Sequence, residues 1–167
     1  MYAGLVARIA ALPALSAGVL LVAAATSLAD TQRVRDPHRD GHSGCEIYTA
    51  TAGHAKGRRL KHTITVADRI PSKSLAPIFL IFGRKSEVGG APRSTLSPGA
   101  SGVRTSLSKN RRTVTYTIKA SRLRSESEIP RRQKSYYWVA NGCFANPDWA
   151  PGARRGGPKL TAHRFRA

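Results

Sequence analysis

Acidic side chains are scarce in this 167-residue sequence, which has nine Asp and Glu against 28 Lys and Arg and a formal charge of +19 at pH 7. A charge of this sign and size favours partners that carry many negative charges, but it does not determine the fold. Outside a cell, such partners include anionic wall polymers, acidic phospholipids, nucleic acid and acidic proteins. The alternative is that the abundance of Arg, with that of Ala and Gly, is a compositional bias without function.

Recognisable catalytic motifs are also lacking. The sequence has no Gly-x-Ser-x-Gly elbow, no His-Glu-x-x-His, no phosphate-binding loop and no dinucleotide fingerprint. One local group, Glu46 with His54 and Arg58, has the residue types of a nuclease site. Salt-bridged residues at strand ends explain this group better, because sequence proximity alone does not establish a site. No cofactor is therefore expected, and an enzyme is the less favoured class.

Cysteine occurs only at Cys45 and Cys143. The wide separation argues against a metal thiolate pair or a redox Cys-x-x-Cys motif. In an exported chain, two cysteines predict one disulfide. It would close a loop of 98 residues, and in the chain-entropy model such a loop stabilises the fold by about 4 to 5 kcal/mol.

Only one long apolar run is present. Arg8 precedes an uncharged stretch over residues 9–25, and Ser27, Leu28 and Ala29 place small residues where a signal peptidase reads them. This pattern predicts a signal peptide over residues 1–29, an extracellular or secreted location and no membrane-spanning segment after cleavage. An uncleaved membrane anchor is the alternative. Because only Arg8 would be lost, the mature charge would be +18, from 27 basic and nine acidic residues.

Residues 30–44 are polar and predict a flexible leader. Asp36, His38, Asp40 and His42 alternate there, and in an extended chain they would share one side. Imidazole and carboxylate groups can hold zinc or copper. The intervening proline and glycine favour a solvated linker instead, so we expect no metal.

Residues 45–151 read as a series of short strands. Alternation is clearest in residues 60–66, with Leu60, Ile64, Val66 and His62 on one face, and in residues 112–120, with Val114, Tyr116, Ile118 and Ala120 inward. Residues 45–52 predict a first strand with Cys45, Ile47 and Thr49 inward. The apolar run 78–82 predicts a strand covered on both faces. Residues 103–107 and 135–144 predict two further strands, and residues 121–129 predict a single helical turn that covers the core.

The fold predicted from this pattern is a small antiparallel β-sandwich, immunoglobulin-like, with the disulfide joining its first and last strands. A small β-barrel is the alternative fold. His62 is predicted to be a buried, hydrogen-bonded residue rather than a catalytic one. Trp149 is expected to cap the base of the domain.

Basic residues cluster at the predicted turns and in the tail over residues 152–167, which is expected to be flexible. Residues 86–102 form a long Gly-, Pro- and Ser-rich segment, which predicts either a binding loop or disorder. The candidate binding residues are Arg58, Arg59, Arg93, Arg111, Arg112, Arg131, Arg132, Arg154 and Arg155. They favour an exported, non-enzymatic module that binds an anionic cell-wall polymer, another polyanion or the cell surface. A secreted hydrolase acting on an anionic substrate and an interaction domain of a complex are the alternatives.

Overall fold

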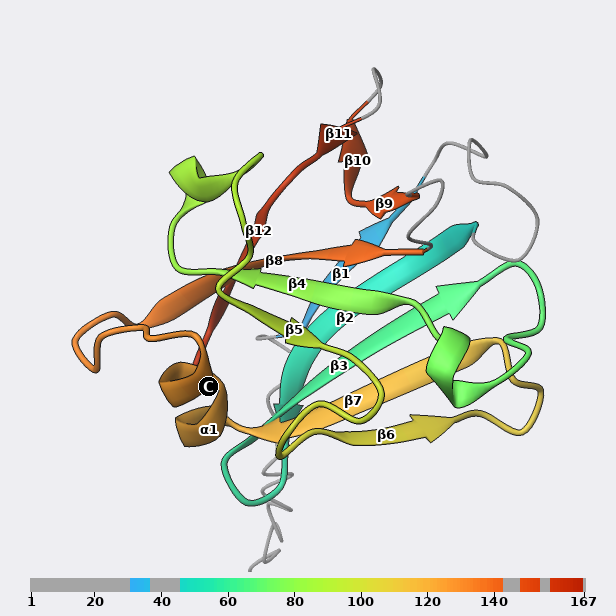
Figure 1. The fold of residues 1–167 in the computed structure, drawn as a ribbon, viewed down its shortest axis with the longest axis horizontal. Coiled ribbons are helices and arrows are strands. Elements are labelled where there is room, and N and C mark those ends of the chain that lie inside the picture. The colour runs from blue at the N-terminus through green and yellow to red at the C-terminus, as the bar shows by residue number, and fades with distance from the viewer. Residues whose placement is uncertain (1–30, 37–45, 143–147, 154–156, 167) are drawn as a thin grey trace, which may run out of the picture.

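The strands form two antiparallel sheets that pack against each other (Figure 1). The computed structural model describes residues 31–36, 46–142, 148–153 and 157–166. The first sheet has the order β1-β2-β3-β7-β6, with β1 at Gln32–Arg35, β2 at Ile47–Ala55, β3 at Arg59–Val66, β7 at Thr113–Lys119 and β6 at Arg104–Leu107. The second has the order β12-β8-β4-β5, with β12 at Thr161–Arg164, β8 at Ser135–Asn141, β4 at Ile78–Phe82 and β5 at Ser94–Leu96.

The smaller elements lie at the ends of these sheets. Strand β9, Trp149–Ala150, pairs with β8, and β10, Gly152–Ala153, pairs with β11, Gly157–Pro158. The helix α1 spans Ala120–Glu126, and two short 3-10 helices span Lys73–Leu75 and Lys85–Glu87. The all-β prediction is therefore confirmed. Within the part of the chain that the structure describes, the sheets do not close on each other, so the alternative prediction of a β-barrel was wrong.

The core fills the space between the sheets. The alternation predicted for β3 and β7 is confirmed, because Leu60, Ile64, Val114 and Ile118 are buried there. Strands β4 and β8 contribute Phe79, Ile81, Tyr136 and Trp138 from the other side. A helix follows β7 as expected, but α1 has seven residues, about two turns rather than one. Its Leu123 is buried against the same core.

The outer face of the second sheet is apolar and largely covered. Phe82, Val139 and Leu160 form a second buried cluster, and Leu80, Tyr137 and Trp149 pack against it. This explains why β4 is a continuous apolar run: alternate residues point into the main core and into the outer cluster. Trp149 thus packs on the outer face of this sheet, beside β8.

A β-bulge in β2 overturns one predicted orientation. The pairing between β2 and β3 shifts in register between Ile47 and Thr49. A bulge inserts one residue and reverses the alternation beyond it. Ile47 therefore points inward as expected, but Ala50 and Ala52 follow it into the core, and Thr49 lies on the outer face. The prediction that Thr49 points inward was wrong for this reason.

Two segments predicted to be flexible contain strands. Residues 32–35 form β1, which pairs with β2, and residues 161–164 form β12, which pairs with β8. Both are edge strands of only four residues, and each is held by pairing with a strand from another part of the chain. Val34 of β1, and His163 and Phe165 in and beside β12, pack inward. The predicted signal peptide over residues 1–29, Cys45 and Cys143 lie outside the described residues, so these predictions stay untested.

The segment 86–102 is not a structureless loop. It contains the end of the second 3-10 helix and strand β5. The Glu87 carboxylate accepts hydrogen bonds from the Gly83 N–H at 2.7 Å and the Arg84 N–H at 3.2 Å, and it pairs with Arg93 at 2.7 Å. No helix among the described residues is long and apolar enough to cross a membrane.

Candidate functional site

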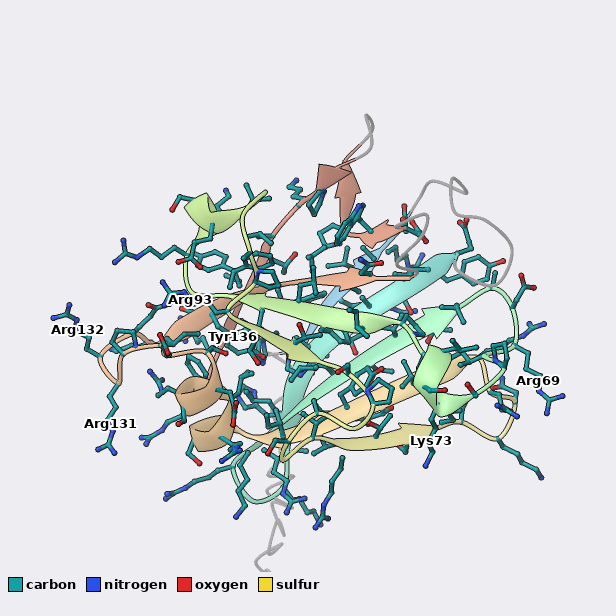
Figure 2. The ribbon with its side chains drawn as sticks, in the orientation of Figure 1. Arg69, Lys73, Arg93, Arg131, Arg132 and Tyr136 are labelled. Atoms are coloured by element: carbon teal, nitrogen blue, oxygen red, sulfur yellow. The ribbon has the colours of Figure 1, made fainter. Side chains whose placement is uncertain are left out.

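The arginines predicted to bind polyanions lie at opposite ends of the sandwich. Arg59 pairs with Lys119 at the α1 end of the β3–β7 ladder, whereas Arg112 lies beyond its other end. An eight-residue strand such as β3 separates these ends by about 20 to 25 Å. Figure 2 shows Arg131 and Arg132 on the loop beyond α1, with Arg93 on the same side of the molecule, and Arg69 and Lys73 at the opposite end. The turns therefore do not form one patch.

Two of these arginines hold the local backbone in place. Arg93 is engaged by Glu87, as described above. The Arg111 guanidinium donates a hydrogen bond to the Pro71 carbonyl, and the Arg111 backbone has a positive φ of 58° at the turn between β6 and β7. Arg154 and Arg155 lie outside the described residues. The arginines predicted to bind polyanions are thus dispersed, and two of them already have structural partners.

The outer face of the first sheet is a regular array of hydroxyl groups. Strand register places side chains from β2, β3, β7 and β6 next to one another in rows across this face: Thr49, Thr65 and Thr113 in one row; Thr51, Thr63, Thr115 and Ser106 in the next; and Thr117 beside Lys61 in a third. The Thr65 Oγ1 and Thr113 Oγ1 atoms lie 3.1 Å apart and share a hydrogen bond. Neighbouring strands are about 4.8 Å apart and alternate residues about 6.8 Å apart, so these hydroxyls form a grid.

Cations share this grid with the hydroxyls. The side chains of Arg33, Arg35, Arg59, Lys61, Arg104 and Lys119 belong to the same outward-facing positions. The five strands β1, β2, β3, β6 and β7 contain no Asp or Glu. Arg59 and Lys119 are directly paired across the ladder, and like charges in that arrangement repel each other. We name this surface, made of the threonines and Ser106 of the three rows and of these six cations, the outer sheet face.

A shallow depression lies at the β1–β2 corner of the outer sheet face. It has a volume of about 460 Å³ and is lined by Arg33, Arg35, Asp36, Glu46, Tyr48, Thr49 and Thr65. Tyr48 lies at the β2 bulge and is 44% exposed, although it is a large aromatic residue. A bulge re-aims a side chain and increases the local twist. The same irregularity that turned Thr49 outward therefore also projects Tyr48 over this depression.

A buried carboxyl cluster closes the end of β2 near the depression. The Asp148 carboxylate accepts a hydrogen bond from the Ile47 N–H and shares one with Asp36. Burial is the largest cause that raises the pKa of Asp148 to about 7; Asp36 and Glu46 raise it further, whereas the bond from Ile47 lowers it. A carboxyl that shares a proton with a second carboxyl behaves in this way. Asp148 is buried and connects β9 to the start of β2, which is a structural role.

Histidines cluster inside the sandwich rather than on a reactive surface. The prediction for His62 is confirmed, because its side chain is fully buried and its Nε2 lies 2.7 Å from the hydroxyl of Tyr136, which is buried in the main core and is labelled in Figure 2. The His163 ring lies 4.9 Å from the His54 ring and 6.4 Å from the His62 ring, centroid to centroid. Burial lowers the pKa of His62 to about 3, and the nearby His163 and His54 add to this effect.

The other groups considered from the sequence do not form a site. Glu46 precedes β2 and His54 lies near its far end, so an extended strand keeps them about 25 Å apart. The possible ligands His38, Asp40 and His42 lie outside the described residues. In the part of the chain that the structure describes, no group of three or more His, Cys, Asp or Glu side chains could hold a metal ion.

The outer sheet face was not among the sites predicted from the sequence. A signal was present, since Thr recurs at every second position in residues 49–51, 63–65 and 113–117. This repetition shows that each strand has a hydroxyl face, but it does not show that the three strands are neighbours. Comparison of the chain with protein-family models and with curated proteins found no match.

Proposed function

We propose that this protein is an exported, non-enzymatic module that binds a linear anionic polymer through the outer sheet face. The observation that carries the proposal is the composition of that face: hydroxyls and six cations from five adjacent strands, with no acid on those strands. Cations in this arrangement attract a polyanion, and the hydroxyls donate or accept hydrogen bonds along it. The dispersed arginines of the turns add long-range attraction.

The shape of the face favours an extended ligand. The cations run from Arg35 and Arg33 on the edge strand β1, through Lys61 and Lys119 in the centre, to Arg104 on the edge strand β6. Five strands span about 20 Å, a distance over which a polymer presents several repeating units. A polymer that crosses the strands therefore contacts cations at both edges and in the middle.

Three predictions complete this proposal. The exported location rests on the signal peptide predicted over residues 1–29. A disulfide between Cys45 and Cys143 would suit that compartment and would tie the start of β2 to the end of β8. The immunoglobulin-like character of the two sheets is part of the same proposal.

The experiment that tests the proposal compares two double variants with equal changes in charge. Lys61→Glu with Lys119→Glu alters two inner strands of the outer sheet face, β3 and β7. Arg69→Glu with Lys73→Glu alters the segment between β3 and β4, at the end of the molecule away from Arg131 and Arg132 (Figure 2). Binding to polyphosphate and to duplex DNA is measured across a salt series. We expect the first variant to lose at least about tenfold in affinity. Its affinity should also depend less steeply on salt, because binding with fewer phosphate contacts releases fewer counterions. Equal losses in both variants would show that only net charge matters.

A secreted hydrolase is the second candidate, and one observation favours it. A carboxyl with a pKa near 7 is the kind of group that general acid–base catalysis uses. Asp148, however, is buried and bonded to the backbone of Ile47, and it does not line the depression. Hydrolysis of an anionic polymer by the native chain that disappears in Asp148→Asn would establish this second function and refute the first.

A further inference from the structure

The depression beside β1 and β2 differs from the rest of the outer sheet face. It combines guanidinium groups, hydroxyls, an exposed aromatic ring and two carboxylates within one hollow. We propose that it is a subsite for one hydroxyl-bearing, negatively charged sugar unit, so that the polymer bound by the outer sheet face is an anionic polysaccharide. This inference rests on the proposed function and identifies the class of its ligand.

Tyr48 supplies the surface that a sugar ring needs. Its ring is 44% exposed, which makes it the only aromatic residue among the large apolar side chains exposed in the described part of the chain. It is held outward by the bulge, which is fixed by the pairing of Ile47 with Val66 and of Thr49 with Thr65. Aromatic rings bury much apolar area at small entropic cost, and the C–H face of a sugar is a flat apolar partner of similar size. One such ring suits one sugar unit.

The polar groups of the depression match the remaining chemistry of such a unit. Arg33 and Arg35 lie on β1, opposite Thr51 and Thr49 of β2. A planar guanidinium binds a carboxylate through two parallel hydrogen bonds. The Thr49 and Thr65 hydroxyls each offer a donor and acceptors to sugar hydroxyls, and the bond between Thr65 and Thr113 leaves part of that capacity.

Asp36 and Glu46 set an upper limit on ligand charge. Both line the depression, and their negative charge disfavours a ligand with several anionic groups close together. A sugar acid carries one charge per unit, surrounded by neutral hydroxyls, and meets this limit. Polyphosphate carries a charge on every phosphorus and has no hydroxyl along its length. Single-stranded nucleic acid binds through successive stacking aromatics, and the depression offers only Tyr48.

The test measures binding of the full chain to polygalacturonate, polyphosphate and duplex DNA across a salt series. The variants are Tyr48→Ser and Thr49→Val, with Thr95→Val as the matched control, because Thr95 lies on β5 of the second sheet, away from the outer sheet face and from the depression. Valine keeps the β-branched shape of threonine and removes only the hydroxyl. Melting temperatures of all variants establish that the fold is intact.

We expect the native chain to bind polygalacturonate most tightly. Tyr48→Ser and Thr49→Val should each lower that affinity by about tenfold, as the loss of a stacking ring or of a hydrogen bond to a charged ligand does. Their affinity for polyphosphate should fall by less, because polyphosphate has no sugar ring to fill the depression. The affinities of Thr95→Val should change less than about twofold, because Thr95 lies on the other sheet. Glu46→Gln should strengthen polyphosphate binding.

Two results would overturn the inference in distinguishable ways. Binding of polyphosphate or DNA as tight as that of polygalacturonate, with no selective effect of Tyr48→Ser, would remove the sugar subsite and leave the outer sheet face as a general polyanion surface. Absence of salt-sensitive binding to all three polymers would refute the proposed function together with the subsite.

Discussion

Replacing Asp148 with Asn should make the protein more stable at neutral pH. Asp148 is buried, shares a hydrogen bond with Asp36, and has a pKa raised to about 7. In the unfolded chain the same carboxyl has its ordinary pKa of 3.8, so between these values the unfolded state releases a proton that the folded state keeps. Stability due to this group is therefore present at low pH and is lost as pH rises from 3.8 towards 7. The Asn side chain resembles the protonated carboxyl and avoids this loss.

The size of the effect follows from the two pKa values. Each pH unit between them changes the free energy of unfolding by about 1.4 kcal/mol, which sets an upper limit of about 4 kcal/mol at pH 7. Asn can still accept the bond from the Ile47 N–H and can donate to Asp36. We therefore expect Asp148→Asn to be more stable than the native chain by about 2 to 4 kcal/mol at pH 7 and equally stable near pH 3.8.

Urea unfolding followed by tryptophan fluorescence measures this difference, because Trp138 is fully buried. Unfolding curves of both chains at pH 4, 5, 6 and 7 give the free-energy difference as a function of pH. A difference that grows with pH supports the reasoning. A variant that is less stable at pH 7, or a difference independent of pH, would show that the Asp148–Asp36 contact does not hold a proton.

Two further predictions concern stability. His62 has the opposite pH dependence to Asp148: its pKa is lowered to about 3 in the folded chain from 6.5, so its contribution is present above pH 6.5 and is lost as pH falls towards 3. His62→Phe should lower the free energy of unfolding by about 1 kcal/mol at neutral pH, because the bond to Tyr136 is lost. In urea unfolding its stability should fall less between pH 7 and pH 4 than that of the native chain. An equal fall in both chains would contradict this. Lys119→Glu should raise stability by about 0.2 to 1 kcal/mol, because it faces Arg59 across the ladder, and a lowered melting temperature would show that the two side chains do not interact.

The sequence predicted the strands whose burial is regular. Leu60, Ile64, Val114 and Ile118 alternate with polar residues because one face of β3 and of β7 packs on the core and the other meets water. The aromatic strand β8 was identified for a related reason, since Tyr136 and Trp138 fill the core beside Phe79. Patterns of this kind reflect the local environment of each residue, and they can be read without knowledge of the partners.

Features that depend on partners could not be predicted in this way. The short strands β1 and β12 are stabilised by pairing with β2 and β8, and neither has enough alternating residues to indicate a strand by itself. The bulge at Tyr48 results from how β2 and β3 are aligned, so a strict period of two placed Thr49 on the wrong face. The outer sheet face requires knowledge that β7 lies beside β3 and that β6 lies beside β7.

The outer faces of the two sheets differ: one is covered by apolar side chains, and the other carries hydroxyls and cations. This difference supports a binding role for the first sheet. Leu160 and Trp149 help to cover the second sheet with apolar side chains, which stabilises the fold and leaves little for a ligand. The first sheet instead retains the like-charged pair of Arg59 and Lys119, at a cost to stability. A local arrangement that costs stability is expected at functional sites. Because Lys119→Glu should relieve that cost while it weakens polymer binding, loss of binding in a more stable chain separates function from folding.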